Sequence, residues 1–151
     1  MSSSLLSQRN LVPGDTNGKR DIIRDTVAKT TRRVSVSGSG AQANQNSDQA
    51  TVSTDGRYVA FVSTASNLVP GDTNGKTDVS RKDLTTGAVV RVSVGAGGKQ
   101  GNNGSNSGRI RPDGKAVVFS SLASNLVTGD TNGQPTSSFA TWSSTPPNAS
   151  R

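Results

Sequence analysis

The chain has 151 residues and a net charge of +7, with only 29% hydrophobic and 3% aromatic residues. This length fits one ordinary domain, and the low apolar content predicts a sparsely filled core. Cysteine, histidine and glutamate are absent from the sequence, which excludes disulfides, thiolate metal sites and a Ser-His-Asp triad. No apolar run approaches membrane-spanning length, and residues 1–10 lack the basic and apolar regions of a signal peptide.

The positive charge is spread along the chain, with one local cluster at Lys29, Arg32 and Arg33. A basic protein is attracted to nucleic acids and to other anionic surfaces. Only three Phe, one Tyr and one Trp are present to stack on bases. The composition therefore favours solubilising charge on exposed strands over a nucleic-acid partner.

A nine-residue string recurs along the chain. Asn67–Gly75 reads Asn-Leu-Val-Pro-Gly-Asp-Thr-Asn-Gly, and the same letters occur at Asn10–Gly18 and, with Thr128 in place of proline, at Asn125–Gly133. A near-constant interval between such strings is typical of a repeat architecture. The sequence therefore divides into an irregular N-terminus (1–9), two repeats (10–66 and 67–124), a partial repeat (125–133) and a non-repeat tail (134–151).

Alternating residues predict strands in each repeat. Residues 33–36 and 91–94 both read Arg-Val-Ser-Val, which predicts strands with their two valines on one face. The segments that follow, residues 37–49 and 95–107, are rich in Gly, Asn and Gln and predict surface loops.

An Asp-Gly turn at residues 55–56 lies between two strand-like segments, 50–53 and 57–63, and this pattern predicts a β-hairpin. Residues 108–120 repeat the pattern around Asp113 and Gly114. The second strand of each hairpin contains a continuous apolar run, Val59–Val62 or Val117–Phe119. Such a run predicts a strand that is buried on both faces.

Two strings give the chain a family resemblance. The string Ser-x-Asp-Gly-Arg-Tyr-Val-Ala-Phe-Val-Ser at 53–63 and the string Asp-Leu-Thr-Thr-Gly-x-x-x-Arg-Val-Ser-Val at 83–94 resemble the TolB-type, WD-repeat-like β-propeller repeats of bacterial proteins, in a long-repeat variant. The resemblance covers about residues 10–133. It implies an all-β fold of four-stranded antiparallel blades, in which the Asp-Gly hairpin forms the inner half of each blade.

On this assignment the chain holds about two blades' worth of strands. These are an outer half-blade over about 20–36, a whole blade over about 49–94 and an inner half-blade over about 108–120. Propellers typically have four to eight blades, so the ring is predicted to be incomplete. Two or three copies of the chain would supply enough blades for a closed homo-oligomeric ring.

The repeated loop also has a calcium-like spacing of oxygen ligands. Side-chain oxygens of Asp72, Asn74 and Asp78, with the carbonyl of Lys76, alternate along the loop as calcium ligands do. The first copy repeats the set at Asp15, Asn17, Lys19 and Asp21. The alternative interpretation is that Pro-Gly-Asp and Thr-Asn-Gly are consecutive turns stabilised by their own side chains. Both interpretations stand at the level of the sequence.

The tail departs from the repeat after Gly133. Permitted codons for Thr136–Ser143, read one base earlier, encode Asp-Val-Phe-Val-Arg-Asp-Leu-Val, which parallels residues 78–84. We therefore expect that the tail from about Pro135 is a frameshift product and that the chain is a fragment of a larger propeller. Sequencing the gene tests this expectation.

The sequence thus predicts a non-catalytic β-propeller scaffold that binds a protein or glycan, with calcium as the one candidate cofactor. A propeller that is part of a prolyl-oligopeptidase-like hydrolase is an alternative, and a truncated gene product without function is another. The family resemblance implies a bacterial protein in a secreted or periplasmic setting.

Overall fold

The computed structural model describes residues 4–8, 12–25 and 30–141, and within these the side chains of 12–24 and 30–136. No α-helix occurs in these ranges, and none of their residues forms a helix long and apolar enough to cross a membrane. One short 3-10 turn covers Ala96–Gly98. The strands are β1 (Ser4–Gln8), β2 (Asp21–Asp25), β3 (Thr31–Arg33), β4 (Ser47–Val52), β5 (Tyr58–Ser63), β6 (Asp78–Asp83), β7 (Val89–Arg91), β8 (Ser105–Ile110), β9 (Ala116–Ser121) and β10 (Thr136–Thr141).

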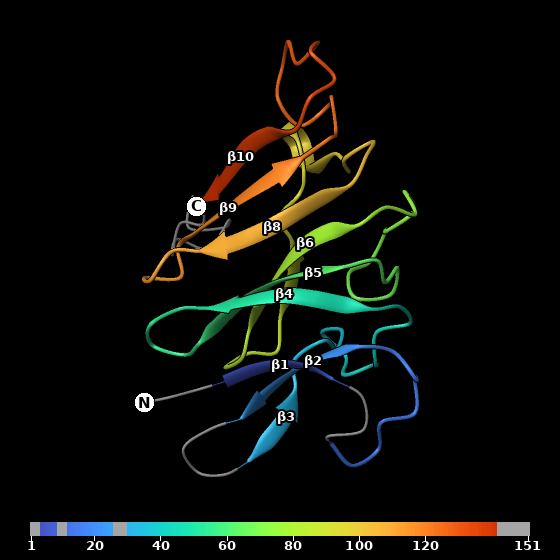
Figure 1. The fold of residues 1–151 in the computed structure, drawn as a ribbon, viewed down its shortest axis with the longest axis vertical. Coiled ribbons are helices and arrows are strands. Elements are labelled where there is room, and N and C mark those ends of the chain that lie inside the picture. Colours follow the sequence, from blue (N-terminus) through green and yellow to red (C-terminus); the bar gives the residue numbers. More distant parts are fainter. Residues whose placement is uncertain (1–3, 9–11, 26–29, 142–151) are drawn as a thin grey trace, which may run out of the picture.

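The strands form three antiparallel sheets. The middle sheet has four strands in the order β4-β5-β6-β7, and it lies between a first sheet, β1-β2-β3, and a third sheet, β8-β9-β10 (Figure 1). Strands that follow one another in the chain are neighbours in each sheet. This is the meander of a propeller blade, so the predicted all-β fold of blade-like sheets in an open, incomplete arrangement is confirmed.

The predicted hairpins form through their Asp-Gly turns. Gly56 takes a φ of +70°, which glycine adopts at no steric cost. The Oδ1 of Asp55 accepts hydrogen bonds from the Arg57 amide (3.0 Å) and the Ser53 hydroxyl (2.5 Å). In the second hairpin, Asp113 accepts from the Lys115 amide in the same way, at 2.9 Å.

Two separate apolar cores lie on the two faces of the middle sheet. Val59 and Phe61 face the first sheet and pack with Ile22, while Ala60 and Val62 face the third sheet. All four of these β5 side chains are buried, which confirms the prediction for this strand. The prediction is wrong for β9, where Val118 is 42% exposed because no further described sheet covers that face.

The three-stranded sheets are larger than the half-blades that the sequence predicts. β1 lies in the segment expected to be irregular and pairs with β2 in a register that places Leu6 opposite Ile23. At the other end, β10 pairs with β9 and takes the place that β6 has beside β5. In both sheets the added strand satisfies backbone groups that an isolated edge would leave unpaired. The frameshift hypothesis for the tail stays a prediction.

Two further expectations need correction. The Arg-Val-Ser-Val strands end at Arg33 and Arg91, and the serines that follow are as buried as the neighbouring valines. The predicted surface loops are shorter than expected, since β4 begins at Ser47 and β8 at Ser105. The reason is a buried hydroxyl pair across each hairpin, such as Ser47 to Ser63 at 3.0 Å, which the sequence pattern does not reveal.

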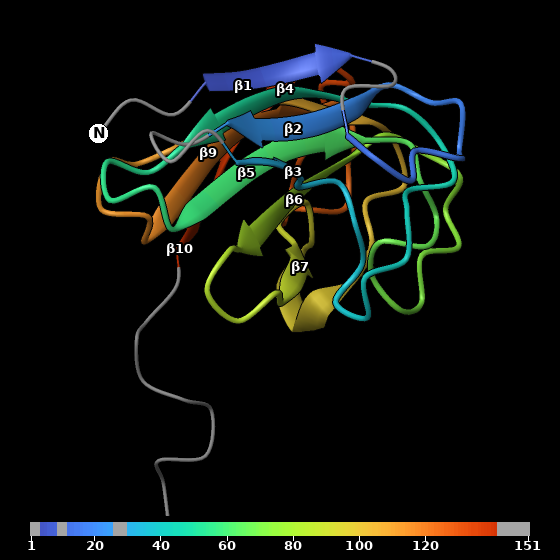
Figure 2. The same ribbon diagram turned by 90° about the horizontal axis from the view of Figure 1, so that it is seen from below.

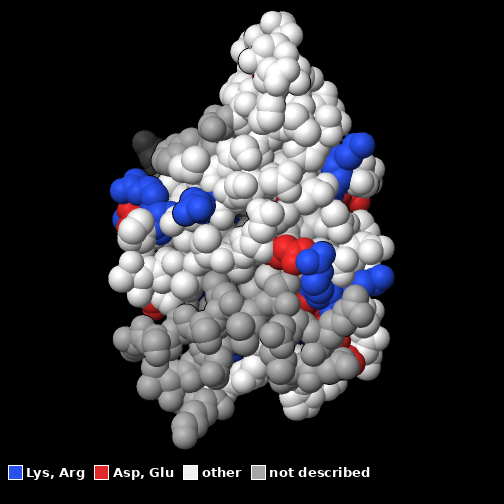
Figure 3. Space-filling model, viewed as in Figure 1, with Lys and Arg blue, Asp and Glu red and all other residues white. Residues whose placement is uncertain are grey.

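The repeated loops and the hairpin turns lie at opposite ends of the sheets (Figure 2). In Figure 3, most of the described lysines, arginines and aspartates in view lie toward these two ends, and the described surface between them is largely uncharged. The end that carries the repeated loops is called the loop rim below and comprises residues 12–20, 37–46, 66–77, 95–104 and 122–135.

Candidate functional site

The second repeated loop contains a buried ion cluster built on Arg91. The Nη2 of Arg91 lies 3.3 Å from Oδ2 of Asp72, and its Nε lies 3.2 Å from Oδ2 of Asp78. All three side chains are at least nine-tenths buried. The hydroxyl of Ser93 donates to Oδ1 of Asp78 at 2.7 Å. The cation between the two predicted calcium-ligating carboxylates is therefore a guanidinium.

The first loop repeats this cluster with its own residues. Arg33 lies 3.3 Å from Asp15 and 3.0 Å from Asp21, and the Ser35 hydroxyl donates to Asp21 at 2.6 Å. The pairing of β2 with β3 places Ile23 opposite Arg33, which brings this arginine beside Asp21. Two copies of one Asp-Arg-Asp arrangement indicate that it belongs to the repeat itself.

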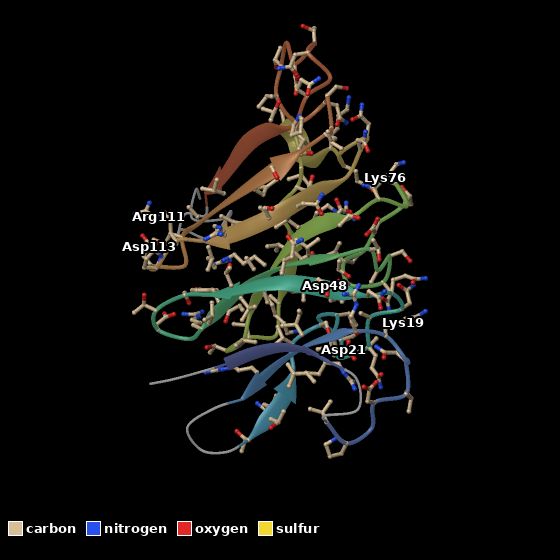
Figure 4. The ribbon with its side chains drawn as sticks, in the orientation of Figure 1. Lys19, Asp21, Asp48, Lys76, Arg111 and Asp113 are labelled. Carbon is tan, nitrogen blue, oxygen red and sulfur yellow. The ribbon has the colours of Figure 1, made fainter. Side chains whose placement is uncertain are left out.

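The asparagines of both loops stabilise the backbone. Oδ1 of Asn74 accepts the Lys76 amide at 2.9 Å, and its Nδ2 donates to the Gly101 carbonyl at 3.0 Å. Asn17 makes the equivalent bonds to the Lys19 amide and the Ala43 carbonyl. The side chains of Lys19 and Lys76 lie at the outer edge of the loop rim (Figure 4).

These contacts decide how well the loops fit calcium. The carboxylates contact an arginine and the asparagine oxygens accept from backbone amides, whereas calcium requires six to eight oxygens around one point. Within the described ranges, no group of three acidic, histidine or cysteine side chains is placed to hold a metal. As built, the loops do not fit the ion, and calcium binding stays a prediction.

Burial also acts on the charge state of the cluster. Desolvation raises the pKa of Asp78 above its ordinary value, and the opposing effects of the Ser93 hydroxyl and the Arg91 guanidinium do not cancel it. The ionised form of this carboxylate therefore depends on its two partners. Loss of either partner would further favour the protonated acid.

Two glutamines that the sequence analysis did not single out hold the loops in place. Oε1 of Gln100 accepts the amides of Thr73 and Asn74 at 3.1 Å each, and its Nε2 donates to the Gly71 carbonyl. Gln42 makes the same contacts with the first loop. The available signal was their equivalent position in the two polar stretches of the repeat.

The two polar segments 37–46 and 95–104, called the connecting segments, each join two consecutive repeated loops. Gln42 binds the first loop through its side chain, while its carbonyl accepts from Nδ2 of Asn67 in the second loop at 2.7 Å. The Asn44 amide donates to Oδ1 of the same Asn67 at 3.0 Å. Asn125 repeats this contact with the Gln100 carbonyl at 2.8 Å. The loop rim is thus a hydrogen-bonded chain that runs across all three sheets.

Replacing Gln100 with alanine is expected to destabilise the second loop by about 1–3 kcal/mol, because two loop amides lose their acceptor. Hydrogen exchange at Thr73 and Asn74 measures the effect. The matched Gln42→Ala variant is expected to affect Thr16 and Asn17 in the same way. Unchanged exchange at Thr73 and Asn74 would contradict the role assigned to Gln100.

A groove in the loop rim lies between residues 37–41 of the first connecting segment and the loop 66–73. Its volume is about 610 Å³. Hydroxyl groups of Ser37, Ser39 and Ser66 line it together with the apolar side chains of Leu68 and Pro70. Such a surface offers hydrogen bonds and apolar contact to an uncharged ligand.

Comparison with known proteins finds similarity among solved structures. No protein-family model matches the chain, and neither does any curated protein. The crystal structure of TolB from Acinetobacter baumannii is similar at 20% sequence identity with a TM-score of 0.45. The similarity covers 80% of this chain and 26% of that chain, so this chain spans about a quarter of the TolB that it matches.

Proposed function

We propose that the chain is a non-catalytic β-propeller module whose loop rim binds a protein or glycan. The groove beside the second loop is the observation that supports this function, because its walls are held by the glutamine and asparagine contacts described above. Preorganised walls lower the entropic cost of binding. The described carboxylates lie in ion pairs or hydrogen-bonded turns, which supports a role without catalysis.

Binding to arrays of immobilised glycans and extended peptides tests this function. Ser39 is exposed at the groove, so a Ser39→Trp variant is expected to fill it and lose at least tenfold in affinity. Thr86→Trp, at an exposed position outside the groove, is the matched control and should bind as the parent does. Equal binding by parent and Ser39→Trp would contradict the groove as the binding site.

We further propose that copies of the chain associate head to tail into a ring. Arginines of one sheet lie at the hairpin glycine of the next: Arg81 donates to the Gly114 carbonyl of the third sheet at 3.1 Å, and the Arg24 guanidinium lies close to Gly56 of the middle sheet. The third sheet leaves Val118 exposed at the position that Ala60 occupies in the middle sheet. A second copy would cover this face as the third sheet covers the middle one.

Light scattering of the purified protein, with and without calcium, measures the mass that this proposal requires. A dimer or trimer that Val118→Asp dissociates, and that Thr86→Asp does not, would support it. A monomer whose mass does not change with calcium would count against both the ring and calcium-dependent association.

Two alternatives from the sequence have their own tests. A gene sequence that encodes a nucleophile elbow in a neighbouring domain would favour the hydrolase. A chain that aggregates without a discrete mass would favour a truncated product. The extracellular or periplasmic setting also remains a proposal, and cell fractionation tests it.

A further inference from the structure

A second cavity, outside the loop-rim groove, lies between the first and middle sheets and has a volume of about 400 Å³. Four basic residues line it: Arg24, Arg32, Arg33 and Lys82. None of the described residues that line it is acidic. We refer to this cavity as the basic cleft.

Two of these cations lie on neighbouring strands of the first sheet. Arg24 on β2 pairs directly with Arg32 on β3 in the antiparallel register. Side chains at directly opposed positions lie on the same face, and like charges there destabilise a sheet. Nε of Arg24 is buried and has no hydrogen-bond partner among the described residues. The antiparallel register therefore places two like charges at opposed positions on neighbouring strands.

Lys82 adds a third positive charge from the middle sheet. It is only 5% exposed, and its ammonium group donates to the carbonyls of Val36 at 2.8 Å and Gly87 at 3.3 Å. Burial lowers the pKa of this lysine. Carbonyl dipoles solvate the ammonium group but do not cancel its charge, so a negative partner in the cleft would be favoured.

The carboxylates whose side chains the structure describes are occupied outside the Arg24, Arg32 and Lys82 side of the cleft. Among the described side chains, the acidic partners Asp15 and Asp21 both belong to Arg33. The chain contains no glutamate, and the other described aspartates that form ion pairs contact Arg20, Arg57, Arg91 and Arg111. Asp55 accepts from the Ser53 hydroxyl, and Asp130 accepts from the Thr136 hydroxyl. The described carboxylates thus leave Arg24, Arg32 and Lys82 as a site for an external anion.

We propose that the basic cleft binds a small ligand through a multiply charged oxyanion of the phosphate type. Arg24 and Arg32 present guanidinium groups from adjacent strands, and two such groups recognise phosphate oxygens by charge-assisted, bidentate hydrogen bonds. Lys82 contributes positive potential from the opposite wall. The cleft volume leaves room for the rest of a small ligand, such as a sugar, attached to the oxyanion. This site goes beyond the proposed loop-rim function and does not depend on it.

Isothermal titration of the whole chain with inorganic pyrophosphate, at constant ionic strength, tests the proposal. The parent is expected to bind at a single saturable site. Arg32→Gln is expected to weaken binding about tenfold or more, since it removes a charge-assisted contact. Arg111→Gln removes the same charge from an exposed pair at the hairpin end of the molecule and should change the affinity less than twofold (Figure 4).

A second readout separates binding from folding. Because Arg32 lies opposite Arg24, Arg32→Gln is expected to raise the melting temperature of the ligand-free protein while reducing the further increase that pyrophosphate causes. A sugar phosphate that binds more tightly than pyrophosphate would show that the cleft also contacts the sugar attached to the phosphate. The proposal would be overturned if pyrophosphate binding did not saturate, or if Arg32→Gln and Arg111→Gln weakened binding equally. Either result would indicate attraction by net charge alone.

Discussion

Replacing Arg91 with alanine is expected to lower the free energy of unfolding by about 3–5 kcal/mol, because two buried carboxylates lose their shared cation. Asp72 and Asp78 are 5% exposed in their side chains, so water does not replace the guanidinium without opening the loop. Urea denaturation followed by circular dichroism measures the loss. Arg111→Ala breaks a pair whose side chains are 56% and 41% exposed, and it should cost less than about 1 kcal/mol.

The cost of Arg91→Ala should depend on pH. Burial already raises the pKa of Asp78, and removal of the arginine raises it further in the folded protein. A carboxyl whose folded pKa exceeds its unfolded value takes up a proton more readily when folded, so stability is regained as the pH falls. The difference between parent and variant should therefore narrow from pH 7 toward about pH 4. A constant difference would contradict the assigned role of Asp78.

The same variant tests the calcium prediction. Without Arg91, the carboxylates of Asp72 and Asp78 have no cation between them. If the loop has the ligand set of a calcium site, calcium should raise the melting temperature of Arg91→Ala, and magnesium should do so less. A melting temperature that does not respond to calcium in either parent or variant would contradict calcium binding by this loop.

The sequence predicts local features well because their causes are local. The Asp-Gly turns and the hairpins depend on residues close together in the chain. The burial of Val59–Val62 requires the neighbouring sheets, but the continuous apolar run that indicates it is local. The nine-residue repeat also identifies the blade period. The sequence does not reveal Arg91 as the partner of Asp78, since the antiparallel pairing of β6 and β7 brings them together.

The buried Asp-Arg-Ser cluster can be recognised when the sequences of the two repeats are aligned with each other. Asp21, Arg33 and Ser35 keep the order of the second cluster, Asp78, Arg91 and Ser93. The prediction of an alternating strand at Arg-Val-Ser-Val placed the serine on the exposed face. The serine is buried instead, because its hydroxyl donates to a carboxylate. The exposure of Val118 has a different origin: whether a face is covered depends on a neighbouring sheet, which residues 117–119 do not specify.

The two cores on the faces of the middle sheet have no described apolar side chain in common. Phe61→Ala should therefore act mainly on the core that contains Phe61. Phe61 is fully buried and packs toward the first sheet with Ile22 and Leu68. Its loss is expected to cost about 3–5 kcal/mol through lost burial and the cavity left behind. Urea denaturation measures the total, and hydrogen exchange should show faster opening in β2 than in β9.

Val118→Ala provides the control, because it lies on the corresponding strand of the third sheet with 42% exposure. In a monomer its cost should stay within about 0.5 kcal/mol, as for other surface substitutions. A larger cost that grows with protein concentration would show that a second copy buries this face, since association couples stability to concentration. Equal protection of β2 and β9 in Phe61→Ala would show instead that the two cores unfold together, and the sheets would then form one cooperative unit.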